Sequence, residues 1–352
     1  MVLLIHSLIL LASFYFLAVI CDRYFVKSLD KIADKLKMSS DMAGATLMAI
    51  GSSAPELFVS FIALFKPGNE AIGAGTIVGS AIFNILVIIG AVAIIKKAII
   101  SWQPIIRDVL FYSISIILLL IFFRDGSVNL TEASIFVGLY VLYIIAIIKW
   151  KKILPYTDNN KNNNSKDEVK EEVCVKKNFL CRIKKIIYQT LDFIFPRKNY
   201  WLTFFLCILI IGGLSWVLVE SAIVIAETLK IPSVIIGLTI LAIGTSIPDL
   251  VSSVIVAKQG RGGMAISNSI GSNIFDILIG LGLPWVIMTS IYGVEIPVIT
   301  ENLNSSIFLL FATVIAVLFL LILHKWKLKR TSGLILIGFY ITYLIWAITK
   351  AL

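Results

Sequence analysis

The sequence predicts an all-α polytopic membrane protein with ten transmembrane helices, arranged as two inverted five-helix repeats. Three observations predict this fold class. The 352 residues are 59% hydrophobic and only 15% charged, whereas soluble domains are about one quarter charged. Ten separate apolar runs are each long enough to cross a bilayer as a helix. Motifs in the first half of the chain also recur in the second half.

The apolar runs locate the expected membrane spans. A spanning helix needs about 20 mostly apolar residues. The first run has no basic segment before it and no small-residue cleavage site after it, so we interpret it as a span and not as a signal peptide. The ten runs cover residues 2–20, 42–65, 71–95, 107–123, 132–150, 201–226, 233–257, 264–289, 304–324 and 332–350.

The composition also excludes several classes of protein. A mean hydropathy of +0.97 excludes a soluble enzyme, a disordered protein and a nucleic-acid-binding module. Four cysteines without a C-x-x-C spacing do not make a disulfide framework, and two histidines, His6 and His324, do not make a His-rich zinc site. The phosphate-binding motif G-x-x-x-x-G-K-[ST] is missing from the sequence. We therefore expect no ATP-driven step, no cofactor and no enzymatic activity.

The distribution of basic residues predicts the orientation in the membrane. Lys and Arg are enriched in cytoplasmic loops. We therefore expect the loops after odd-numbered spans to lie in the cytoplasm and both termini to lie outside. In this count Arg107 belongs to the loop after the third span. The net charge of +10 is then a topology signal. Of the 31 Lys and Arg residues, all lie in these loops except Lys66, Arg124, Lys230 and Lys350.

The expected domains are a first five-helix repeat over residues 1–150, a central loop over 151–200 and a second five-helix repeat over 201–352. The loop begins with a low-complexity stretch, KNNNSKDEVKEEV, which predicts disorder. Its second part, KKNFLCRIKKIIYQTLDFIF, alternates basic and apolar residues. That part is either a solvated tether or an amphipathic helix on the membrane surface. Cys174 and Cys181 lie in this loop and are expected to be inert thiols.

Three pairs of matching segments define the repeat. GATLMAIGSSAPELFVS (44–60) and GLTILAIGTSIPDLVSS (237–253) share nine of seventeen residues, and GSAIFNIL (79–86) matches GSNIFDIL (271–278). Upstream, IADKLKMS matches IAETLKIP at the same offset of 193 residues as the first pair. Because each half holds five spans, an odd number, the second half enters the membrane from the opposite side. Secondary transporters use this plan and place their substrate sites at the repeat interface.

Three acidic residues lie deep inside expected spans, away from their ends: Glu56 in the second, Asp249 in the seventh and Asp276 in the eighth. An acid at this depth is costly, so it pairs with another group or binds an ion. No expected span carries Lys, Arg or His at a matching depth, so the expected partner is a mobile cation. The alternative is a protonated acid held for packing. Glu220 also falls in a span, but its repeat counterpart is Lys27 at a loop edge, and we interpret Glu220 as structural.

Oxygen-bearing residues surround these acids at helical spacing. Pro55 and Pro248 lack an N–H, so each should free the carbonyl four residues earlier, those of Gly51 and Gly244. Ca²⁺ prefers about six to eight oxygen ligands. The segments around the three acids contain no thiolate or imidazole that a softer metal would need. The hydroxyl and amide residues at this spacing are Ser52, Ser53, Ser80, Asn84, Thr245, Ser246 and Ser272.

With these motifs the sequence resembles the cation/calcium exchanger superfamily, whose sodium/calcium exchangers carry two such repeats. The resemblance rests on GSSAPEL with GSAIFN in the first half and on GTSIPDL with GSNIFD in the second. It implies an ion site formed by spans two, three, seven and eight, across which spans one and six slide. The ligands it implies are the backbone carbonyls of Ala49 and Ala242 and the side chains of Ser52, Ser53, Glu56, Ser80, Asn84, Thr245, Ser246, Asp249, Ser272 and Asp276.

The acids of the second repeat resemble those of potassium-dependent sodium/calcium exchangers. Asp249 stands where many prokaryotic exchangers have Glu, and the shorter side chain leaves room for K⁺. Asp276 either stays protonated and donates a hydrogen bond, or ionises to hold an additional K⁺. Proton/calcium exchangers usually have Gly-Asn-Ala where this chain has Gly51-Ser52-Ser53, which disfavours that type.

The resemblance and the residues together predict a secondary antiporter that exchanges Na⁺ for Ca²⁺ across the plasma membrane by alternating access. The alternatives are the same exchanger with K⁺ co-transport, followed by an H⁺/Ca²⁺ exchanger. A cation channel and an intramembrane protease are less consistent with one two-fold site and no nucleophile–base pair. The expected partners are Ca²⁺, Na⁺ and the lipid bilayer, without nucleic acid or an obligate protein partner. The Ile, Lys and Asn bias indicates a prokaryotic cell membrane.

Overall fold

The computed structural model of the chain describes residues 2–36, 38–66, 68, 71–95, 98–155, 188–195, 199–231, 233–293, 295–298 and 303–351. Within this part, eight helices are long and apolar enough to cross a membrane. Two further pairs of helices pass the same test together but are bent by 42° and 43° at a short break. With each bent pair counted as one span, the described chain has ten spans. Asn159–Glu172, Cys174 and Cys181 lie outside the described residues.

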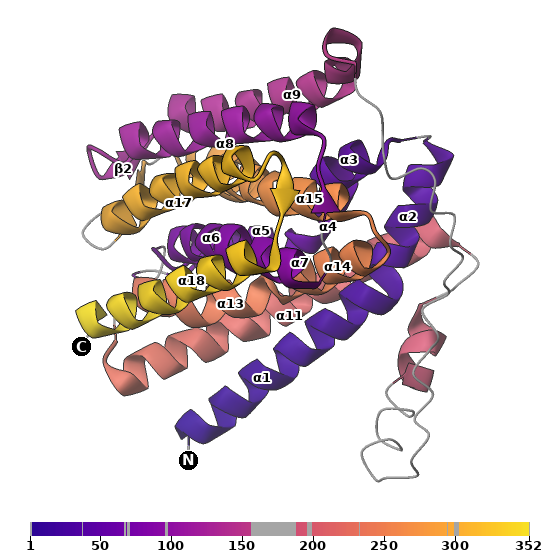
Figure 1. Ribbon diagram of the computed structural model, residues 1–352. Coiled ribbons are helices and arrows are strands. Elements are labelled where there is room, and N and C mark those ends of the chain that lie inside the picture. Colours follow the sequence, from indigo (N-terminus) through magenta and orange to yellow (C-terminus); the bar gives the residue numbers. More distant parts are fainter. Residues whose placement is uncertain are drawn as a thin grey trace.

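The first repeat contains spans one to five, joined by short connections (Figure 1). Span one is a continuous helix of 34 residues, longer than the apolar run at 2–20 because its polar second half stays helical. The elements of this repeat, in chain order, are α1 (Val2–Ile20), η1 (Cys21–Phe25), α2 (Val26–Lys35), α3 (Ser40–Ala43), η2 (Gly44–Met48), α4 (Ala49–Ser52), α5 (Ala54–Ala63), α6 (Ala71–Phe83), η3 (Asn84–Ile88), α7 (Ile89–Ile95), β1 (Ala98–Ile99), α8 (Trp102–Phe122), β2 (Ser127–Val128) and α9 (Leu130–Ile153).

The second repeat contains spans six to ten and repeats this pattern. The segments named η are π-helical turns, and four of them recur at equivalent places in the two repeats: η2 with η4, and η3 with η5. The elements are α11 (Tyr200–Leu229), α12 (Ser233–Ile236), η4 (Gly237–Leu241), α13 (Ala242–Thr245), α14 (Ile247–Lys258), α15 (Gly262–Phe275), η5 (Asp276–Leu281), α16 (Gly282–Tyr292), β3 (Ile296–Pro297), α17 (Leu303–Leu323), β4 (Lys327–Leu328) and α18 (Arg330–Ala351).

Two short antiparallel strand pairs join the repeats at opposite faces of the molecule. β1 pairs with β4, aligning Ala98 with Leu328, and β2 pairs with β3, aligning Ser127 with Pro297. β1 and β4 follow odd-numbered spans and therefore lie on one face, which we call the odd-loop face. β2 and β3 follow even-numbered spans and lie on the other, the even-loop face. Because each pair takes one strand from each repeat, the pairs are related to each other as an inverted repeat requires.

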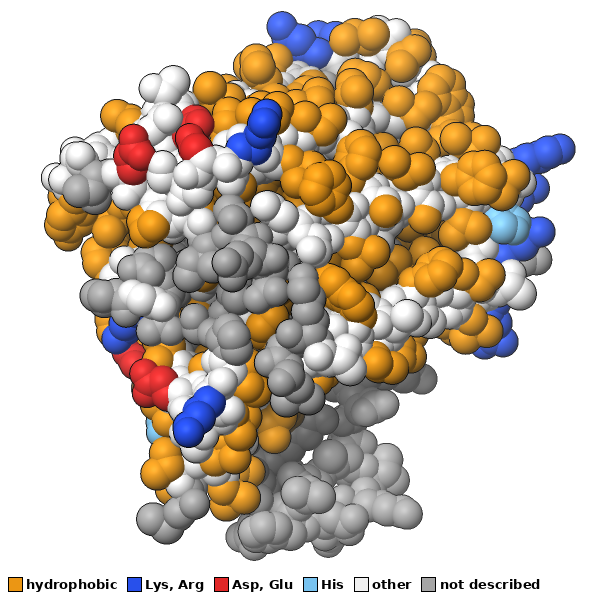
Figure 2. All heavy atoms as spheres, turned by 90° about the vertical axis from the view of Figure 1, so that its left-hand side faces the viewer, with side chains coloured by type: hydrophobic (Ala, Val, Ile, Leu, Met, Phe, Trp, Pro, Cys, Tyr) orange, Lys and Arg blue, Asp and Glu red, His pale blue; other side chains and the backbone are white. Residues whose placement is uncertain are grey.

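The exterior of the bundle is apolar, and its most buried helices belong to spans three and eight. Figure 2 shows a surface dominated by hydrophobic side chains, with charged ones mostly near the edges of the view. Large hydrophobic residues such as Leu142, Leu209 and Phe319 are more than half exposed. In contrast, all 13 residues of α6 are buried. A bundle that exposes apolar side chains to its surroundings and buries polar ones inside is a multi-pass membrane protein.

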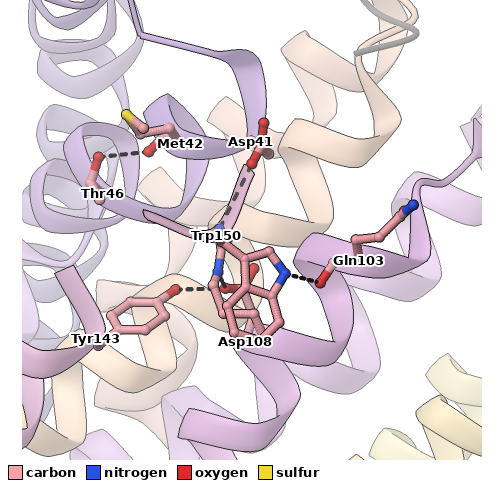
Figure 3. A network of polar contacts seen from close by, with 8 residues as sticks. Asp41, Met42, Thr46, Gln103, Asp108, Tyr143 and Trp150 are labelled. Carbon is pink, nitrogen blue, oxygen red and sulfur yellow. Dashed lines mark hydrogen bonds and ion pairs between the residues drawn. The ribbon is translucent and has the colours of Figure 1, made fainter. Parts of the chain in front are cut away.

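Arg107 corrects the count of basic loop residues. It lies within α8, is fully buried, and donates from Nε to Asp108 Oδ1 at 2.8 Å. The Tyr143 hydroxyl donates to the same oxygen at 3.0 Å, and Arg107 Nη1 lies 3.9 Å from Asp41 Oδ2 (Figure 3). Asp108 and Asp41 are themselves buried. The error arose because α8 begins five residues before the apolar run at 107–123.

Glu220 has a cationic partner. Its carboxylate forms an ion pair with Lys66, whose ammonium group also lies 5.0 Å from the Trp216 ring centroid. Lys66 follows α5 on the even-loop face, so this pair joins the end of span two to α11. The contact agrees with a structural role for Glu220 at the edge of the membrane.

Arg107→Ala should destabilise the protein by about 3–5 kcal/mol, because it leaves the buried Asp108 carboxylate without its cation. The melting temperature of the purified protein in detergent measures this effect. Arg124→Ala is the matched control, since Arg124 is exposed. Equal melting temperatures for the two variants would show that the buried ion pair contributes nothing to stability.

Candidate functional site

Spans two and seven are both bent at a serine that precedes a proline. Ser53 has φ −89° and ψ 7°, and Ser246 has φ −83° and ψ 2°, outside helical geometry. Pro55 and Pro248 stand in the first turn of the helices that follow, where a missing N–H costs no hydrogen bond. The chain therefore bends by 42° and 43° at equivalent places in the two repeats.

The bends determine which backbone carbonyls are hydrogen-bonded. The Ser53 N–H bonds to the Ala49 carbonyl and the Ser246 N–H to the Ala242 carbonyl, and the same two N–H groups interact only secondarily with Gly51 and Gly244. The Ser53 N–H lies 3.0 Å from the Ala49 oxygen. Within the described residues no other donor replaces the missing proline N–H, so the expectation that the Gly51 and Gly244 carbonyls are freed stays a prediction. A carbonyl oxygen has two lone pairs, so each can still accept a second contact.

Glycines bring each bent span into close contact with a helix of the other repeat. A Cβ atom on Gly79 of span three would lie 2.4 Å from the Leu238 carbonyl oxygen of span seven. At the equivalent crossing, a Cβ on Gly271 of span eight would lie 2.8 Å from Ala45 of span two. Small residues allow such backbone contact between membrane helices. The sequence motifs GSAIFN and GSNIFD thus begin with the residue that sets the helix spacing.

The three predicted carboxylates are fully buried where these helices cross. Glu56 Oε1 accepts a hydrogen bond from the Ser246 hydroxyl at 3.1 Å. Asp249 accepts from the Asn84 amide at 3.1 Å and from the Ser272 hydroxyl at 2.9 Å. These bonds connect span two with span seven and span seven with spans three and eight. The charges of Glu56 and Asp249 also act on Asp276, so the three acids share one electrostatic environment.

Three of the hydroxyl groups around the acids donate to carbonyls of their own helices. Ser52 donates to the Met48 carbonyl at 2.8 Å, Thr245 to that of Leu241 at 2.9 Å, and Ser80 to that of Ile77 at 2.9 Å. A hydroxyl whose hydrogen is used in this way keeps its oxygen lone pairs available. The side chains at the crossing are therefore arranged as electron-pair donors, which suits a cation.

Three carboxylate or amide oxygen atoms at the crossing lack a hydrogen-bond partner in the part of the chain that the structure describes, as does the Ser53 hydroxyl. The three are Glu56 Oε2, Asn84 Oδ1 and Asp276 Oδ1, and all of them are buried. Buried polar atoms in proteins are nearly always bonded, so each such exception needs an explanation. A hard cation explains all three together, because carboxylate and amide oxygens are its preferred ligands. This fit concerns a transported ion rather than a resident cofactor.

Two asparagine side chains at the crossing, Asn273 and Asn268, were not predicted from the sequence. Asn273 accepts a hydrogen bond from Asn84 at 2.9 Å, and its own amide donates to Ala81 and to the Tyr112 hydroxyl. Asn268 lies 3.5 Å from the Ser52 hydroxyl. Asn273 belongs to the quoted motif GSNIFD, where the first repeat has Ala81. A polar residue replacing an apolar one between repeats was the signal that could have identified it.

All twelve residues assigned to the site by sequence are buried: Ala49, Ser52, Ser53, Glu56, Ser80, Asn84, Ala242, Thr245, Ser246, Asp249, Ser272 and Asp276. They come from spans two, three, seven and eight, as the resemblance implied. Across the described residues, His, Cys, Asp and Glu side chains form no group of three that could hold a metal by themselves. The site therefore depends on neutral oxygens as well as on its three acids.

Comparison with known proteins agrees with this arrangement. A family model described as sodium/calcium exchanger protein matches residues 6–149 and 199–349. Human sodium/potassium/calcium exchanger 5 is 31% identical over 96% of this chain and 81% of its own length. Human sodium/potassium/calcium exchanger 4 is 29% identical over 98% of this chain and 81% of its own length.

Solved structures of the sodium-calcium exchanger NCX_Mj share the fold. One, soaked with 2.5 mM Na⁺ and 10 mM Sr²⁺, has a TM-score of 0.63 at 24% identity and covers 97% of this chain and 99% of its own. Another, soaked with 10 mM Na⁺ and zero Ca²⁺, has a TM-score of 0.61 and covers 98% of both chains. This likeness confirms the predicted all-α membrane fold with ten helices in two inverted repeats.

Gly79→Ala should weaken cation binding in a protein that still folds. The added methyl group would lie 2.4 Å from the Leu238 oxygen and 2.6 Å from Ala242 Cβ, so spans three and seven must separate. That separation stretches the contact between Asn84 and Asp249. Isothermal titration with Ca²⁺ in Na⁺-free detergent solution measures the loss.

Gly138→Ala is the control for this substitution, because a Cβ at Gly138 meets no atom within 4 Å. Its Ca²⁺ affinity should equal that of the unmodified protein. Unchanged affinity in Gly79→Ala would mean that the spacing of spans three and seven does not determine the site.

Proposed function

This chain belongs to the sodium/calcium exchanger protein family, and we propose that it is a secondary antiporter that exchanges Na⁺ for Ca²⁺ through the site at the crossing of spans two, three, seven and eight. The observation that carries this proposal is the set of unpartnered oxygens on Glu56, Asn84 and Asp276, buried among helices of both repeats. No covalent chemistry is needed for this function. The gradient of one ion drives the movement of the other.

The site favours competition between the two ions. Ca²⁺ is a hard cation that takes oxygen ligands in flexible geometry, and Na⁺ can use the same oxygens. The two hydrogen-bonded acids, Glu56 and Asp249, supply charge from opposite repeats. A bound ion shifts the equilibrium between two conformations only by as much as it binds them differently. Exchange follows when the loaded site, and not the empty one, passes readily between the inward-open and outward-open states.

The setting of the site is a plasma membrane, with the odd-loop face toward the cytoplasm and both termini outside. The excess of Lys and Arg in the odd loops supports this orientation, even with Arg107 removed from the count. The division into repeats at 1–150 and 201–352, joined by a cytoplasmic loop at 151–200, is part of the same proposal. Ca²⁺, Na⁺ and lipid are the partners that it requires.

Potassium co-transport is a second candidate, favoured by the third acid. Asp276 has an unpartnered Oδ1, while its Oδ2 lies 3.5 Å from the Ser80 hydroxyl. Its repeat counterpart is the neutral Asn84, so one side of the site carries an additional negative charge. Relatives at 29–31% identity are named sodium/potassium/calcium exchangers. A monovalent cation at Asp276 would balance the charge that Ca²⁺ leaves uncompensated.

Glu56→Gln and Asp249→Asn should each abolish Na⁺-driven Ca²⁺ uptake, because each removes an anionic ligand while keeping its shape. Uptake of ⁴⁵Ca²⁺ into Na⁺-loaded proteoliposomes measures this, at matched amounts of inserted protein. Glu227→Gln is the control, since Glu227 is an exposed acid on α11. Near-normal uptake in either site variant would contradict the assignment of the site.

Asp276→Asn makes the two sides of the site chemically alike. If Asp276 holds K⁺, this variant should still exchange Na⁺ for Ca²⁺ but lose stimulation by K⁺ added on the side of Ca²⁺. The comparison is ⁴⁵Ca²⁺ uptake in K⁺ against uptake in an impermeant organic cation. Equal rates in the two media for the unmodified protein would rule out the potassium-dependent mechanism and leave Asp276 as a protonated structural acid.

A further inference from the structure

A short segment at the end of the central loop contacts the first helix, far away in sequence. Residues 188–194 are helical and are followed by Phe195. Arg23 donates from Nε and Nη2 to the two carboxylate oxygens of Asp192, at 3.4 and 3.1 Å. The Tyr24 hydroxyl donates to Asp192 Oδ1 at 2.6 Å. A guanidinium that meets both oxygens of a carboxylate fixes orientation as well as distance.

Aromatic contacts strengthen the same junction. The rings of Tyr24 and Phe195 stack with their centroids 4.4 Å apart. The Arg23 guanidinium lies 4.5 Å from the centroid of the Tyr188 ring, a cation–π distance. Phe195 is fully buried and Leu191 nearly so. Residues 188–195 are thus docked on span one, and the expectation of a solvated tether does not hold for them.

The packing of the bundle places this segment with spans one and six. The buried apolar side chains form two large clusters. The larger includes residues from spans three, four, five, eight, nine and ten. The other combines α1, η1 and α11 with Leu191 and Phe195, and it also takes in faces of spans two and seven. α1 and α11 lie side by side along this second cluster (Figure 1). We call α1, η1, α11 and residues 188–195 the peripheral unit.

The peripheral unit contacts the candidate site at both bends, next to Gly51 and Gly244. A Cβ on Gly51 would lie 1.8 Å from the ring of Phe25, and one on Gly244 would lie 1.9 Å from the ring of Phe14. Gly51 and Gly244 are equivalent in the repeat, yet both rings come from span one. Contact of one helix with both bends breaks the symmetry between the repeats. In an alternating-access transporter built from inverted repeats, the inward-open and outward-open states differ in such asymmetric contacts between the repeats.

We propose that residues 188–195 are a brace that holds the odd-loop ends of spans one and six together, so that both move as one body when the site changes its exposure. Arg23, Tyr24 and Asp192 are positioning residues in this brace. The segment directly precedes α11 and is bonded to η1, so a shift of either span pulls on the other. This inference rests on the proposed antiport function.

The strength of the junction determines what its loss should do. The Arg23 and Asp192 side chains are 19% and 29% exposed, so their ion pair is partly screened by solvent. Breaking it should therefore leave the fold intact. It should slow the coupled movement of the two spans while leaving the ligands of the ion unchanged. The expected signature is a lower maximal rate of exchange at an unchanged half-saturating Ca²⁺ concentration.

The test is Na⁺-driven ⁴⁵Ca²⁺ uptake by the full chain in proteoliposomes, over a range of Ca²⁺ concentrations. Asp192→Arg places two guanidinium groups opposite each other and should lower the maximal rate several-fold. Asp192→Asn, a milder change, should lower it less. The double variant Arg23→Asp/Asp192→Arg should restore the rate, because the pair is rebuilt with its charges exchanged. Size-exclusion profiles verify that each variant is folded.

Two controls separate this proposal from others. Asp34→Arg reverses an exposed charge on α2, in the same long helix, and should leave the rate unchanged. Replacement of residues 159–172 by a Gly/Ser linker should also preserve exchange, since those residues precede the brace. Unchanged kinetics in Asp192→Arg, a change in half-saturation alone, or failure of the double variant to recover would overturn the brace. Absence of exchange in the unmodified protein would instead refute the antiport function.

Discussion

Negative charge buried inside an apolar bundle is the constraint on which the rest of this structure depends. Glu56, Asp249 and Asp276 have no exposed surface, and ionised groups at membrane depth are costly unless they are paired or bind an ion. The buried guanidinium of Arg107 does not serve them, because it is paired with Asp108 and Asp41 near the odd-loop face. Hydroxyl and amide donors stabilise the acids in part, and under the proposed function a transported cation completes the site. The stability of the folded protein would then depend on whether an ion occupies the site.

The inverted repeat meets this constraint with few residues. Each repeat contributes a bent span and a glycine-rich span, and each bent span crosses the glycine-rich span of the other repeat. Hydrogen bonds from Ser246 to Glu56 and from Asn84 to Asp249 join the repeats directly at these crossings. The strand pairs at the two faces hold the surrounding spans in register. The contacts of Phe14 and Phe25 depart from this symmetry. Because the two states of the proposed antiporter must differ in such asymmetric contacts, we expect movement to occur there.

Much of the fold could be predicted because a helix that spans the bilayer must have a certain length and hydropathy. The repeated motifs also predicted the symmetry between the two halves. The acids and their hydroxyl neighbours followed from helical spacing. Arg107 was misplaced because its helix, α8, begins five residues before the apolar run at 107–123. The docking of residues 188–195 on Arg23 and Tyr24 joins segments about 169 residues apart, and no local pattern encodes such a contact.

The most direct measurement is anomalous diffraction from crystals of the purified protein soaked in Sr²⁺ without Na⁺, since Sr²⁺ is a heavier analogue of Ca²⁺. A single strong peak is expected between spans two, three, seven and eight, within bonding distance of carboxylate oxygens from Glu56 and Asp249. The peak should disappear when the soak contains a large excess of Na⁺. A peak elsewhere in the bundle, or one that persists in excess Na⁺, would contradict a single competitive site built on the buried acids.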